Sequence, residues 1–298
     1  MTVRNGESGP EPAGPLDEAI VDYYDQTWVD YRLLWLNADN LAVHHGYTDE
    51  STRGHTDALK NMNRVLAQRA AIERGERVLD AGCGVGGSSL WLAQERDVDV
   101  VGITLSAGQL AMARRYAAQR SLADRVQFEQ ADFTATPFPD ASFDVVWAIE
   151  SLCHAPDKAA FYREAARLLR PGGRVIIAEY IRVDRPVDER GERLLHEWLD
   201  GWAVPDIDTT DEHLAHLAES GFTDARIDDV TAHTRPSLRR LYRMAYYTFP
   251  LAVIARRLRI RSVVQHKNVI GSVRQYQALK RKTWFYSIIS ATKPPTAH

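Results

Sequence analysis

The pattern of apolar and polar positions divides the chain into a helical beginning and a long alternation of strands and helices. Apolar side chains recur at helical spacing in residues 16–36 and again in residues 57–72. From residue 77 onward, short apolar runs predict strands at 77–79, 98–103, 126–130, 143–149 and 174–180. Amphipathic stretches between them predict helices at 88–95, 106–120 and 157–169. This alternation indicates βαβ units and a doubly wound, mostly parallel sheet of the α/β class.

The last third of the chain completes this sheet and adds helices. A turn is expected at Pro171-Gly172-Gly173, and a helix at 209–221, capped by Thr209 or Thr210 and ended by Gly221. Strands at 225–230 and 284–292 bring the predicted sheet to seven strands. Further helices are predicted at 236–261 and 274–282. Residues 181–210 show weak periodicity.

We therefore expect five consecutive parts in the chain. They are a disordered tail at 1–15, an N-terminal helical cap at 16–74, a ligand-binding core at 75–181, a cap insertion at 182–208, and the rest of the core with a basic helical cap segment at 209–298. The tail is rich in Gly, Pro and Glu and has no apolar run, so we expect no signal peptide.

A glycine-rich turn follows the first strand of the alternation. It reads Asp80-Ala81-Gly82-Cys83-Gly84-Val85-Gly86-Gly87, and glycines allow the backbone to approach a ligand at positive φ. The spacing is not the G-x-G-x-x-G of dinucleotide enzymes, and the Lys-Ser/Thr of nucleoside-triphosphate loops is absent. Asp80 would repel a pyrophosphate but suits a cationic or amino-bearing ligand. The turn therefore predicts a nucleoside-like cofactor of that kind.

This turn resembles motif I of class I S-adenosylmethionine (SAM) methyltransferases, and the resemblance extends over residues 57–178. Its other marks are Ala131-Asp132-Phe133, Phe143-Asp144-Val145-Val146 and Leu168-Leu169-Arg170-Pro171-Gly172-Gly173. The resemblance implies a Rossmann-like SAM methyltransferase fold with SAM as the cofactor. It also implies cofactor contacts from Asp80, Gly82, Gly84 and Gly86, and an adenine framed by Asp132 and Phe133.

The end of the second strand departs from the general pattern of that family. Most class I members place an Asp or Glu there to hold the ribose, whereas this chain reads Gly102-Ile103-Thr104-Leu105-Ser106-Ala107-Gly108-Gln109. The variant resembles the subgroup of cyclopropane fatty-acid synthases and tocopherol methyltransferases, which implies ribose contacts from Thr104 and Gln109. Thr104 could instead only begin the helix. Leu105 and Glu150 complete the predicted cofactor site.

Two polar residues at strand ends are candidates for the catalytic base. The loops after the fourth and fifth strands face a ligand in such a sheet, and they carry His154 and Glu179. Glu179 interrupts an apolar strand, so we expect it to point into the cleft unless Arg182 or Arg185 satisfies its charge. His154 is the other candidate, with a plain hydrogen-bonding role as its alternative.

Aromatic and basic residues could hold an apolar, anionic acceptor. The aromatic candidates, which could stabilise a carbocation although most such residues belong to the core, are Trp28, Tyr31, Tyr47, Tyr180, Trp198, Trp202 and Tyr246. Arg239, Arg240 and Arg243 recur at helical spacing and suit a diphosphate. Additional ligands for a diphosphate or its Mg²⁺ could come from Asn37, Asn40, His44 and His45.

These features loosely resemble C-methyltransferases that act on prenyl diphosphates, whose base is a Glu after the fifth strand. The first hypothesis is therefore C-methylation of isopentenyl or geranyl diphosphate through a carbocation that Glu179 deprotonates. The alternative is O- or N-methylation of a sugar, polyketide or other natural-product scaffold, with His154 as the base. A third hypothesis is a non-catalytic protein that binds a membrane surface.

The net charge of −3 hides an uneven distribution of charge. The last acidic residue is Asp229, and 14 of the 37 Lys and Arg residues follow it, which leaves 23 basic against 40 acidic residues before it. The overall negative charge argues against nucleic acid as a partner, and the longest apolar run, 246–255, is too short for stable membrane insertion. Two cysteines, Cys83 and Cys153, predict no disulfide framework and a cytoplasmic location. The chain could also form homo-oligomers.

Overall fold

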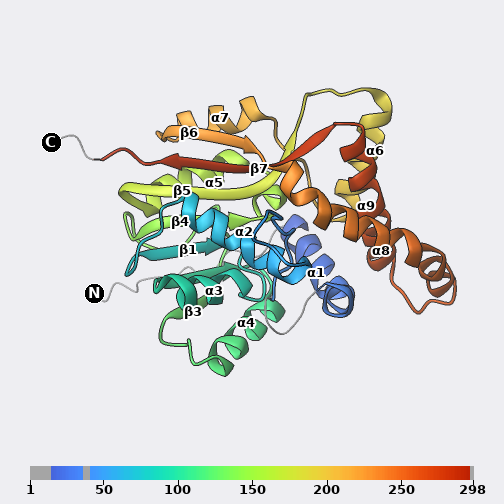
Figure 1. The fold of residues 1–298 in the computed structure, drawn as a ribbon, viewed down its shortest axis with the longest axis horizontal. Coiled ribbons are helices and arrows are strands. Elements are labelled where there is room, and N and C mark those ends of the chain that lie inside the picture. The colour runs from blue at the N-terminus through green and yellow to red at the C-terminus, as the bar shows by residue number, and fades with distance from the viewer. Residues whose placement is uncertain (1–14, 36–40, 296–298) are drawn as a thin grey trace, which may run out of the picture.

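A twisted seven-stranded sheet forms the centre of the computed structural model, which describes residues 15–35 and 41–295 (Figure 1). The strand order is β3-β2-β1-β4-β5-β7-β6, and β7 is antiparallel to both of its neighbours. The strands are β1 Arg77–Ala81, β2 Asp99–Thr104, β3 Val126–Gln130, β4 Phe143–Ile149, β5 Leu169–Arg182, β6 Thr223–Asp229 and β7 Trp284–Thr292. The prediction of a doubly wound, mostly parallel sheet is thus confirmed.

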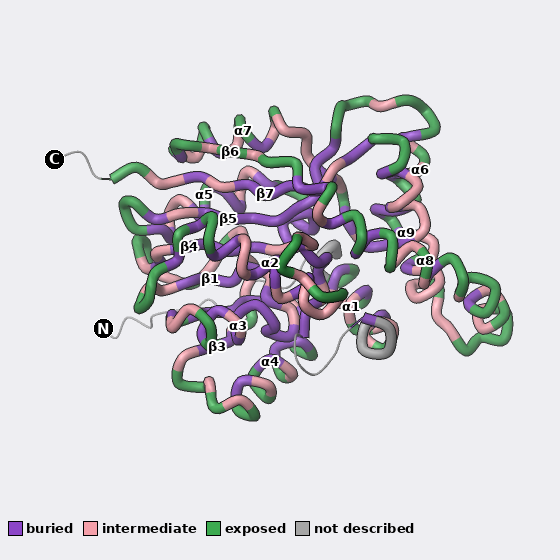
Figure 2. The backbone as a smooth tube through the Cα atoms, viewed as in Figure 1, coloured by how far each residue is buried: buried purple, intermediate pink, exposed green. Residues whose placement is uncertain are grey.

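Strict alternation of side chains along the central strands creates two apolar layers. In β4, Val145 and Trp147 join one buried cluster, while Val146 and Ala148 join the other. The first cluster includes side chains of α2 His55–Arg69, α3 Gly87–Arg96 and α4 Ala107–Gln119. The second includes side chains of α5 Lys158–Leu168 and α7 Thr210–Glu219. The central strands are therefore mostly buried, as Figure 2 shows.

Four further helices pack together at one end of the sheet. They are α1 Pro15–Leu34, α6 Glu189–Gly201, α8 Thr231–Arg257 and α9 Val263–Lys280. Helix α9 contacts each of the other three, so it is the centre of this helical cap. Figure 1 shows that the end of α8 and the turn into α9 project beyond the rest of the molecule.

The sequence analysis located the helices of the core better than those of the cap. Thr209 caps α7 in a reciprocal capping box with Glu212, and Gly221 follows the helix at φ +81°, both as expected. Helix α6 was not predicted, α9 begins well before residue 274, and α8 begins at Thr231 rather than at 236. Helices α6 and α9 cross where Gly201 approaches Gly271, and a contact between glycines leaves no mark in the apolar pattern.

The predicted turn at Pro171-Gly172-Gly173 is part of β5 instead. Gly172 adopts φ +82° and donates its N–H to the carbonyl of Lys293, just after β7, at 2.9 Å. The register with β4 shifts between Phe143 and Val145, which marks a β-bulge. A glycine at positive φ therefore bends the strand here without ending it.

Both cysteines are buried and free, so neither Cys83 nor Cys153 forms a disulfide. Among the described residues, the structure contains no helix with the length and hydropathy needed to cross a membrane. The predicted tail lies outside the described residues, except for Pro15.

Candidate active site

A cavity of about 660 Å³ opens at the carboxyl ends of β1, β2 and β4. One half of its wall is formed by the glycine turn and the strand ends beside it. The other half is formed by residues of the helical cap and by the segment 41–45. The volume is in the usual range for small-molecule sites.

The glycine turn joins β1 to α3 and brings the backbone to the cavity wall. Gly82 and Gly84 have φ of +86° and +55°, and both line the cavity. A Cβ on Gly82 would lie 2.3 Å from the Cβ of Ser151, so only glycine fits there. Ser151 in turn donates from Oγ to the carbonyl of Ala81 at 2.6 Å, which ties the turn to the end of β4.

Gly86 has a packing role instead of the cofactor contact that the motif implied. It caps α3 at φ +86°, but it is not among the residues that line the cavity. A Cβ at this position would lie 2.6 Å from the ring of Phe128. Gly86 therefore allows α3 to pack closely on β3, and its predicted contact with the cofactor is not supported.

Asp80 provides a buried carboxylate on the cofactor side of the cavity. It is 2% exposed, and its Oδ2 accepts a hydrogen bond from the hydroxyl of Ser89. Burial raises the pKa of Asp80 to about 6 against the opposing effect of Ser89. A buried carboxylate that is costly to ionise alone is well suited to a cationic or N–H-bearing ligand.

Polar side chains at the ends of β2 and β3 continue the same wall. The hydroxyl of Thr104 donates to Oε1 of Gln109 at 2.8 Å, so this predicted pair acts as one unit. Ser106 caps α4 by accepting from the backbone N–H of Gln109 at 3.1 Å. Leu105, Asp132 and Phe133 also line the cavity, as the sequence predicted for the cofactor site.

His154 lies on the acceptor side of the cavity in a short 3₁₀ helix, η1 Leu152–His154. Its Nδ1 lies 3.2 Å from the carbonyl of Ala203, which can only accept, so Nδ1 carries the proton. Nε2 is then an acceptor, and the hydroxyl of Tyr24 lies 3.0 Å from it. Burial lowers the pKa of His154 to about 4, so the imidazole is neutral at pH 7.

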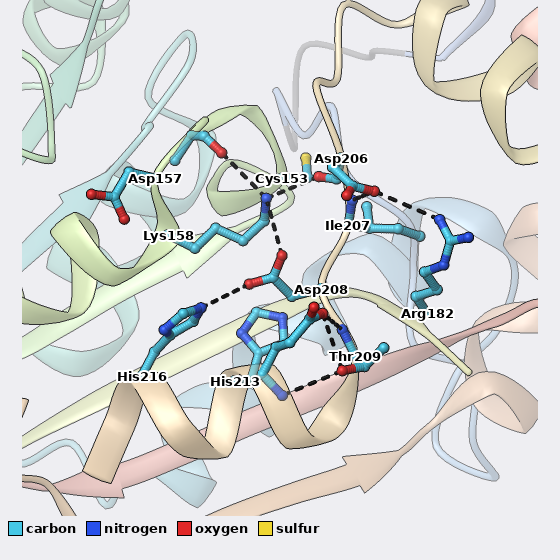
Figure 3. Close-up of polar contacts among 12 residues, drawn as sticks. Cys153, Asp157, Lys158, Arg182, Asp206, Ile207, Asp208, Thr209, His213 and His216 are labelled. Carbon is cyan, nitrogen blue, oxygen red and sulfur yellow. Dashed lines mark hydrogen bonds and ion pairs between the residues drawn. The ribbon is translucent and has the colours of Figure 1, made fainter. Parts of the chain in front are cut away.

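A buried lysine fixes the segment that carries the carbonyl of Ala203. The Lys158 ammonium donates to the carbonyls of Ala155 and Asp206 at 3.2 and 2.9 Å, and lies 3.7 Å from the Asp208 carboxylate. Figure 3 shows this network, with His216 bonded to Asp208 at 3.1 Å on the other side. Lys158 therefore holds the 203–208 segment against the wall that presents His154.

Glu179 does not point into the cleft, so that prediction is wrong. It shares the face of β5 that Ile177 and Ile181 present to the second apolar cluster, and it is absent from the cavity lining. Its carboxyl group is fully buried and accepts from the backbone N–H of Cys153 and Tyr180 at 2.8 and 2.9 Å. Burial raises its pKa to about 8. The alternative, a pairing of Glu179 with Arg182 or Arg185, is also not seen, because these arginines bind other carboxylates.

Glu150, directly after β4, is a carboxylate that does line the cavity. Its two oxygens accept from the hydroxyl of Tyr286 at 2.7 Å, the backbone N–H of His45 at 2.6 Å and the hydroxyl of Tyr180. Burial raises the pKa of Glu150 despite these donors. Glu150 has φ +49°, an uncommon value that the three hydrogen bonds help to hold.

Of the residues proposed for Mg²⁺, the structure describes only His44 and His45. Asn37 and Asn40 lie outside the described residues. His44 and His45 line the cavity but are buried imidazoles with lowered pKa values, that of His45 being about 3 through burial. No group of three His, Cys, Asp or Glu within the described part of the chain is arranged to hold a metal ion.

Of the residues proposed for the acceptor, Tyr180 and Trp202 line the cavity. Trp28 packs against the first apolar cluster, Tyr47 stacks on His233 at 4.3 Å, and Trp198 is fully buried against Trp284. The described cavity wall includes none of the exposed residues Arg239, Arg240, Arg243 and Tyr246. The side chain of Tyr31 lies outside the described residues.

The sequence analysis missed most of the cap side of the cavity. Helix α8 contributes Leu241, Met244, Ala245, Thr248, Leu251, Ala252 and Ala255, and helix α9 contributes Asn268, Val269 and Ser272. The helical spacing of the α8 residues was visible in the sequence, but the face of the helix that meets the core was not. The α9 residues lie before the expected start of their helix.

Known proteins resemble this chain in sequence and in fold. Residues 79–177 match a family model described as a methyltransferase domain. The 27-O-demethylrifamycin SV methyltransferase of Amycolatopsis mediterranei (strain S699) is 38% identical over 230 residues, which cover 76% of this chain and 79% of that protein.

Two solved structures extend the likeness to almost the whole chain. The [4+2]-cyclase SpnF superposes with a TM-score of 0.77 at 26% identity, covering 95% of this chain and 98% of that one. A geranyl diphosphate C-methyltransferase from Streptomyces coelicolor A3(2) reaches a TM-score of 0.72 at 20% identity, with 95% and 100% covered, and shows the fold alone. With a methyltransferase relative this similar, the chain belongs to the class I SAM-dependent methyltransferases, and it is an enzyme of that family.

Proposed function

We propose that this enzyme methylates a hydroxyl oxygen on a large, mainly apolar natural product, with His154 as the general base. The observation that carries the proposal is the geometry of His154 inside the cavity. Its Nδ1–H is committed to the carbonyl of Ala203, and its Nε2 already accepts from a hydroxyl, that of Tyr24. A neutral imidazole fixed in this tautomer can take the proton of an acceptor hydroxyl.

The cofactor half of the cavity fits SAM. Asp80, Thr104, Gln109, Asp132 and Phe133 would hold it, because they combine a buried carboxylate, hydroxyl and amide groups and an aromatic ring on one wall. SAM supplies a methyl group on a sulfonium, whose transfer to oxygen requires alignment of the acceptor and removal of its proton. The chain provides the alignment through the cap helices and the removal of the proton at Nε2 of His154.

The acceptor half of the cavity supports an apolar substrate that carries hydroxyl groups. Its wall from α8 contains Leu241, Met244 and Ala252, while Asn268 and Ser272 of α9 add isolated polar contacts. This mixture of a broad apolar surface and a few polar groups is typical of sites for largely apolar small molecules. The rifamycin relative is named for O-methylation, which agrees with this class of acceptor.

Glu179 has a supporting role in this proposal. By accepting the N–H of Cys153, its carboxyl group holds η1, the short helix that ends in His154. Glu179 is thus a positioning residue behind the base. This differs from the prenyl diphosphate hypothesis, in which Glu179 itself removes the proton.

The prenyl diphosphate hypothesis receives less support from the cavity. Neither its base, Glu179, nor its anion-binding arginines line the described wall. We therefore keep it as the outcome that would contradict the present proposal.

The test is to incubate the protein with methyl-labelled SAM and two panels of acceptors, with and without EDTA. One panel contains apolar hydroxylated natural products, and the other contains isopentenyl and geranyl diphosphates. We expect label in the hydroxylated panel, unaffected by EDTA. Label confined to the prenyl diphosphates and abolished by EDTA would overturn the proposal.

Variants of two histidines sharpen this test. His154→Ala should lower kcat by roughly 10²- to 10⁴-fold, the usual contribution of a general base, while SAM affinity stays within about twofold. His196→Ala is the matched control, because His196 is exposed on α6. Equal activity of the two variants would show that His154 is not the base.

A further inference from the structure

Exposed apolar side chains are concentrated on one projecting part of the molecule. Eleven large apolar side chains are exposed in the described chain, and eight of them lie between residues 246 and 263. Four form a stripe at i, i+4, i+7 and i+11 along the end of α8: Tyr247, Leu251, Ile254 and Leu258, with exposed fractions of 75, 68, 54 and 65%. This apolar stripe lies on the part of α8 that projects from the body of the protein (Figure 1).

Exposed cations accompany the apolar stripe. Arg243 precedes Tyr247 by one helical turn, Arg257 follows Ile254 by three residues, and Arg259 lies just beyond the helix; all three are exposed. No acidic residue follows Asp229 anywhere in the sequence, so α8 and α9 themselves offer these arginines no carboxylate. The surface is therefore apolar and positively charged at once.

The apolar stripe is also continuous with the mouth of the cavity. Leu251 belongs to the stripe and lines the cavity, and Thr248 and Ala255 on the neighbouring face of α8 line it too. Neighbouring faces of the same helix therefore carry the exposed apolar stripe and line the apolar binding site. An apolar molecule that leaves that surface along Leu251 reaches the acceptor half of the cavity.

We propose that the end of α8 and the turn into α9 dock on an anionic lipid surface, from which apolar acceptors enter the cavity. An amphipathic helix with large apolar side chains and flanking arginines lies in the interface of such a surface, with its apolar face among the acyl chains. Anionic head groups neutralise the arginines. This docking is peripheral and requires no membrane-spanning segment.

The charge favours a lipid surface over a second copy of the chain. A symmetric dimer through this surface would bring the arginines beside the stripe of one copy close to those of the other. Helices α8 and α9 carry no carboxylates to offset them, and the nearby Asp30 of α1 is already paired with Arg261 in the turn. Anionic lipid provides the missing negative charge.

The test is co-sedimentation of the full chain with vesicles of phosphatidylcholine alone or of phosphatidylcholine with phosphatidylglycerol. We expect binding to the mixed vesicles that weakens as salt is added, and at least about tenfold weaker binding to phosphatidylcholine alone. The double variant Tyr247→Ser with Ile254→Ser should reduce binding to the mixed vesicles by at least about tenfold, because it removes apolar area from the contact. Neither residue lines the cavity, so activity on a water-soluble acceptor should not change.

Matched controls distinguish binding through this surface from nonspecific adsorption to vesicles. Val183→Ser with Leu214→Ser removes two exposed apolar side chains elsewhere, and Arg115→Glu reverses an exposed charge on α4. Both should bind vesicles as the wild type does, whereas Arg257→Glu with Arg259→Glu should not. The proposal is overturned if the wild type binds no vesicles or if the Tyr247 and Ile254 variant binds them equally well. It is also overturned if the wild type has no affinity for lipid and sedimentation velocity shows that it is a dimer which this double substitution dissociates.

Discussion

The two halves of the active-site cavity are built in different ways. The cofactor half consists of residues at the ends of β1, β2 and β3 or shortly after them, so each lies near the point where its strand ends. The acceptor half is assembled from helices α1, α8 and α9, from segment 41–45 and from residues after α6, which are far apart in the sequence. The first half depends on local backbone geometry, and the second depends on how helices pack.

This difference separates positions that tolerate no larger side chain from positions where side chains of similar volume could be exchanged. Position 82 requires glycine because a Cβ there would overlap Ser151, and no larger residue can replace it without moving the turn. The apolar wall of α8 consists of side chains such as Leu241 and Met244, which could be exchanged for others of similar volume. Cofactor binding should therefore respond to the addition of a single atom to the turn, whereas the choice of acceptor should respond to the position of whole helices.

The largest effect is expected at the turn itself. Gly82→Ala places a Cβ 2.3 Å from that of Ser151 at φ +86°, so strain and overlap should lower the free energy of unfolding by about 3 kcal/mol. SAM affinity, measured by calorimetry, should fall more than about tenfold, because the turn must move to relieve the overlap.

Gly84→Ala is the matched variant on the same turn. Gly84 also has positive φ, at +55°, but a Cβ there meets no atom within 4 Å. We expect a cost of about 1 kcal/mol from the backbone alone. If thermal unfolding ranked the two variants equally, contact with Ser151 would not be the reason for glycine at position 82.

The sequence predicted the cofactor half well for the same physical reason. Strand ends, glycine spacing and the Asp80 carboxylate are local signals, and they located Thr104, Gln109 and Asp132 on the wall. The assignment of Glu179 failed because successive side chains of a strand point to opposite faces of the sheet, so the face of Glu179 is the one shared by the residues two positions away. Ile177 and Ile181 share its face, and that face meets α5 and α7 rather than the ligand.

The acceptor half was predicted poorly because its signals are not local. Trp198 and Tyr47 are large aromatics, but composition alone does not distinguish a residue of the core from one on the cavity wall. The crossing of α6 and α9 at Gly201 and Gly271 shows the same limit, because close approach of two backbones requires small residues that carry no hydropathy signal.

Behind the acceptor half, Glu179 should make stability depend on pH. Its folded-state pKa is about 8, raised from 4.5 by burial. Its contribution to stability is therefore full below pH 4.5 and is lost as pH rises from 4.5 to 8, because over that range the unfolded chain releases the proton while the folded protein keeps it. From about pH 6.5 to 8.5 this costs the wild type about 2 kcal/mol, which Glu179→Gln should remove. Chemical unfolding at several pH values measures the slope.

Glu219→Gln is the control for that measurement, because Glu219 is exposed at the end of α7. It should keep the wild-type slope. A wild-type slope in the Glu179 variant would mean that Glu179 is ionised in the folded protein. A lower kcat in the Glu179 variant with unchanged SAM affinity would support its role in positioning η1.

On the cofactor side, Asp80 should make SAM binding depend on pH in the opposite sense. Its pKa of about 6 in the ligand-free protein means that the carboxylate forms as pH rises through 6. If the carboxylate holds the cationic part of SAM, affinity should be about tenfold weaker at pH 5 than at pH 8. Asp80→Asn should bind SAM more weakly with a flat pH profile; a flat profile in the wild type would exclude this contact.

The smallest effect is expected where α6 crosses α9, and it should be confined to the acceptor half. Gly201→Ala places a Cβ 2.6 Å from the carbonyl oxygen of Lys267, a backbone atom that moves only with its helix. The gain in helix propensity offsets part of this overlap, which leaves a loss of about 1 kcal/mol in stability. Because α9 carries Asn268 and Ser272 on the cavity wall, KM for the acceptor should rise while SAM affinity stays within about twofold.

Gly191→Ala in the same helix is the matched control. Its Cβ would meet side-chain atoms of Asp188, Thr283 and Val187, none of which belongs to α9, so relief of this overlap should not move α9. Steady-state kinetics should then show a normal KM for the acceptor. A parallel loss of SAM affinity in Gly201→Ala would contradict the comparison, because it would mean that the two halves of the cavity respond to helix packing as one unit.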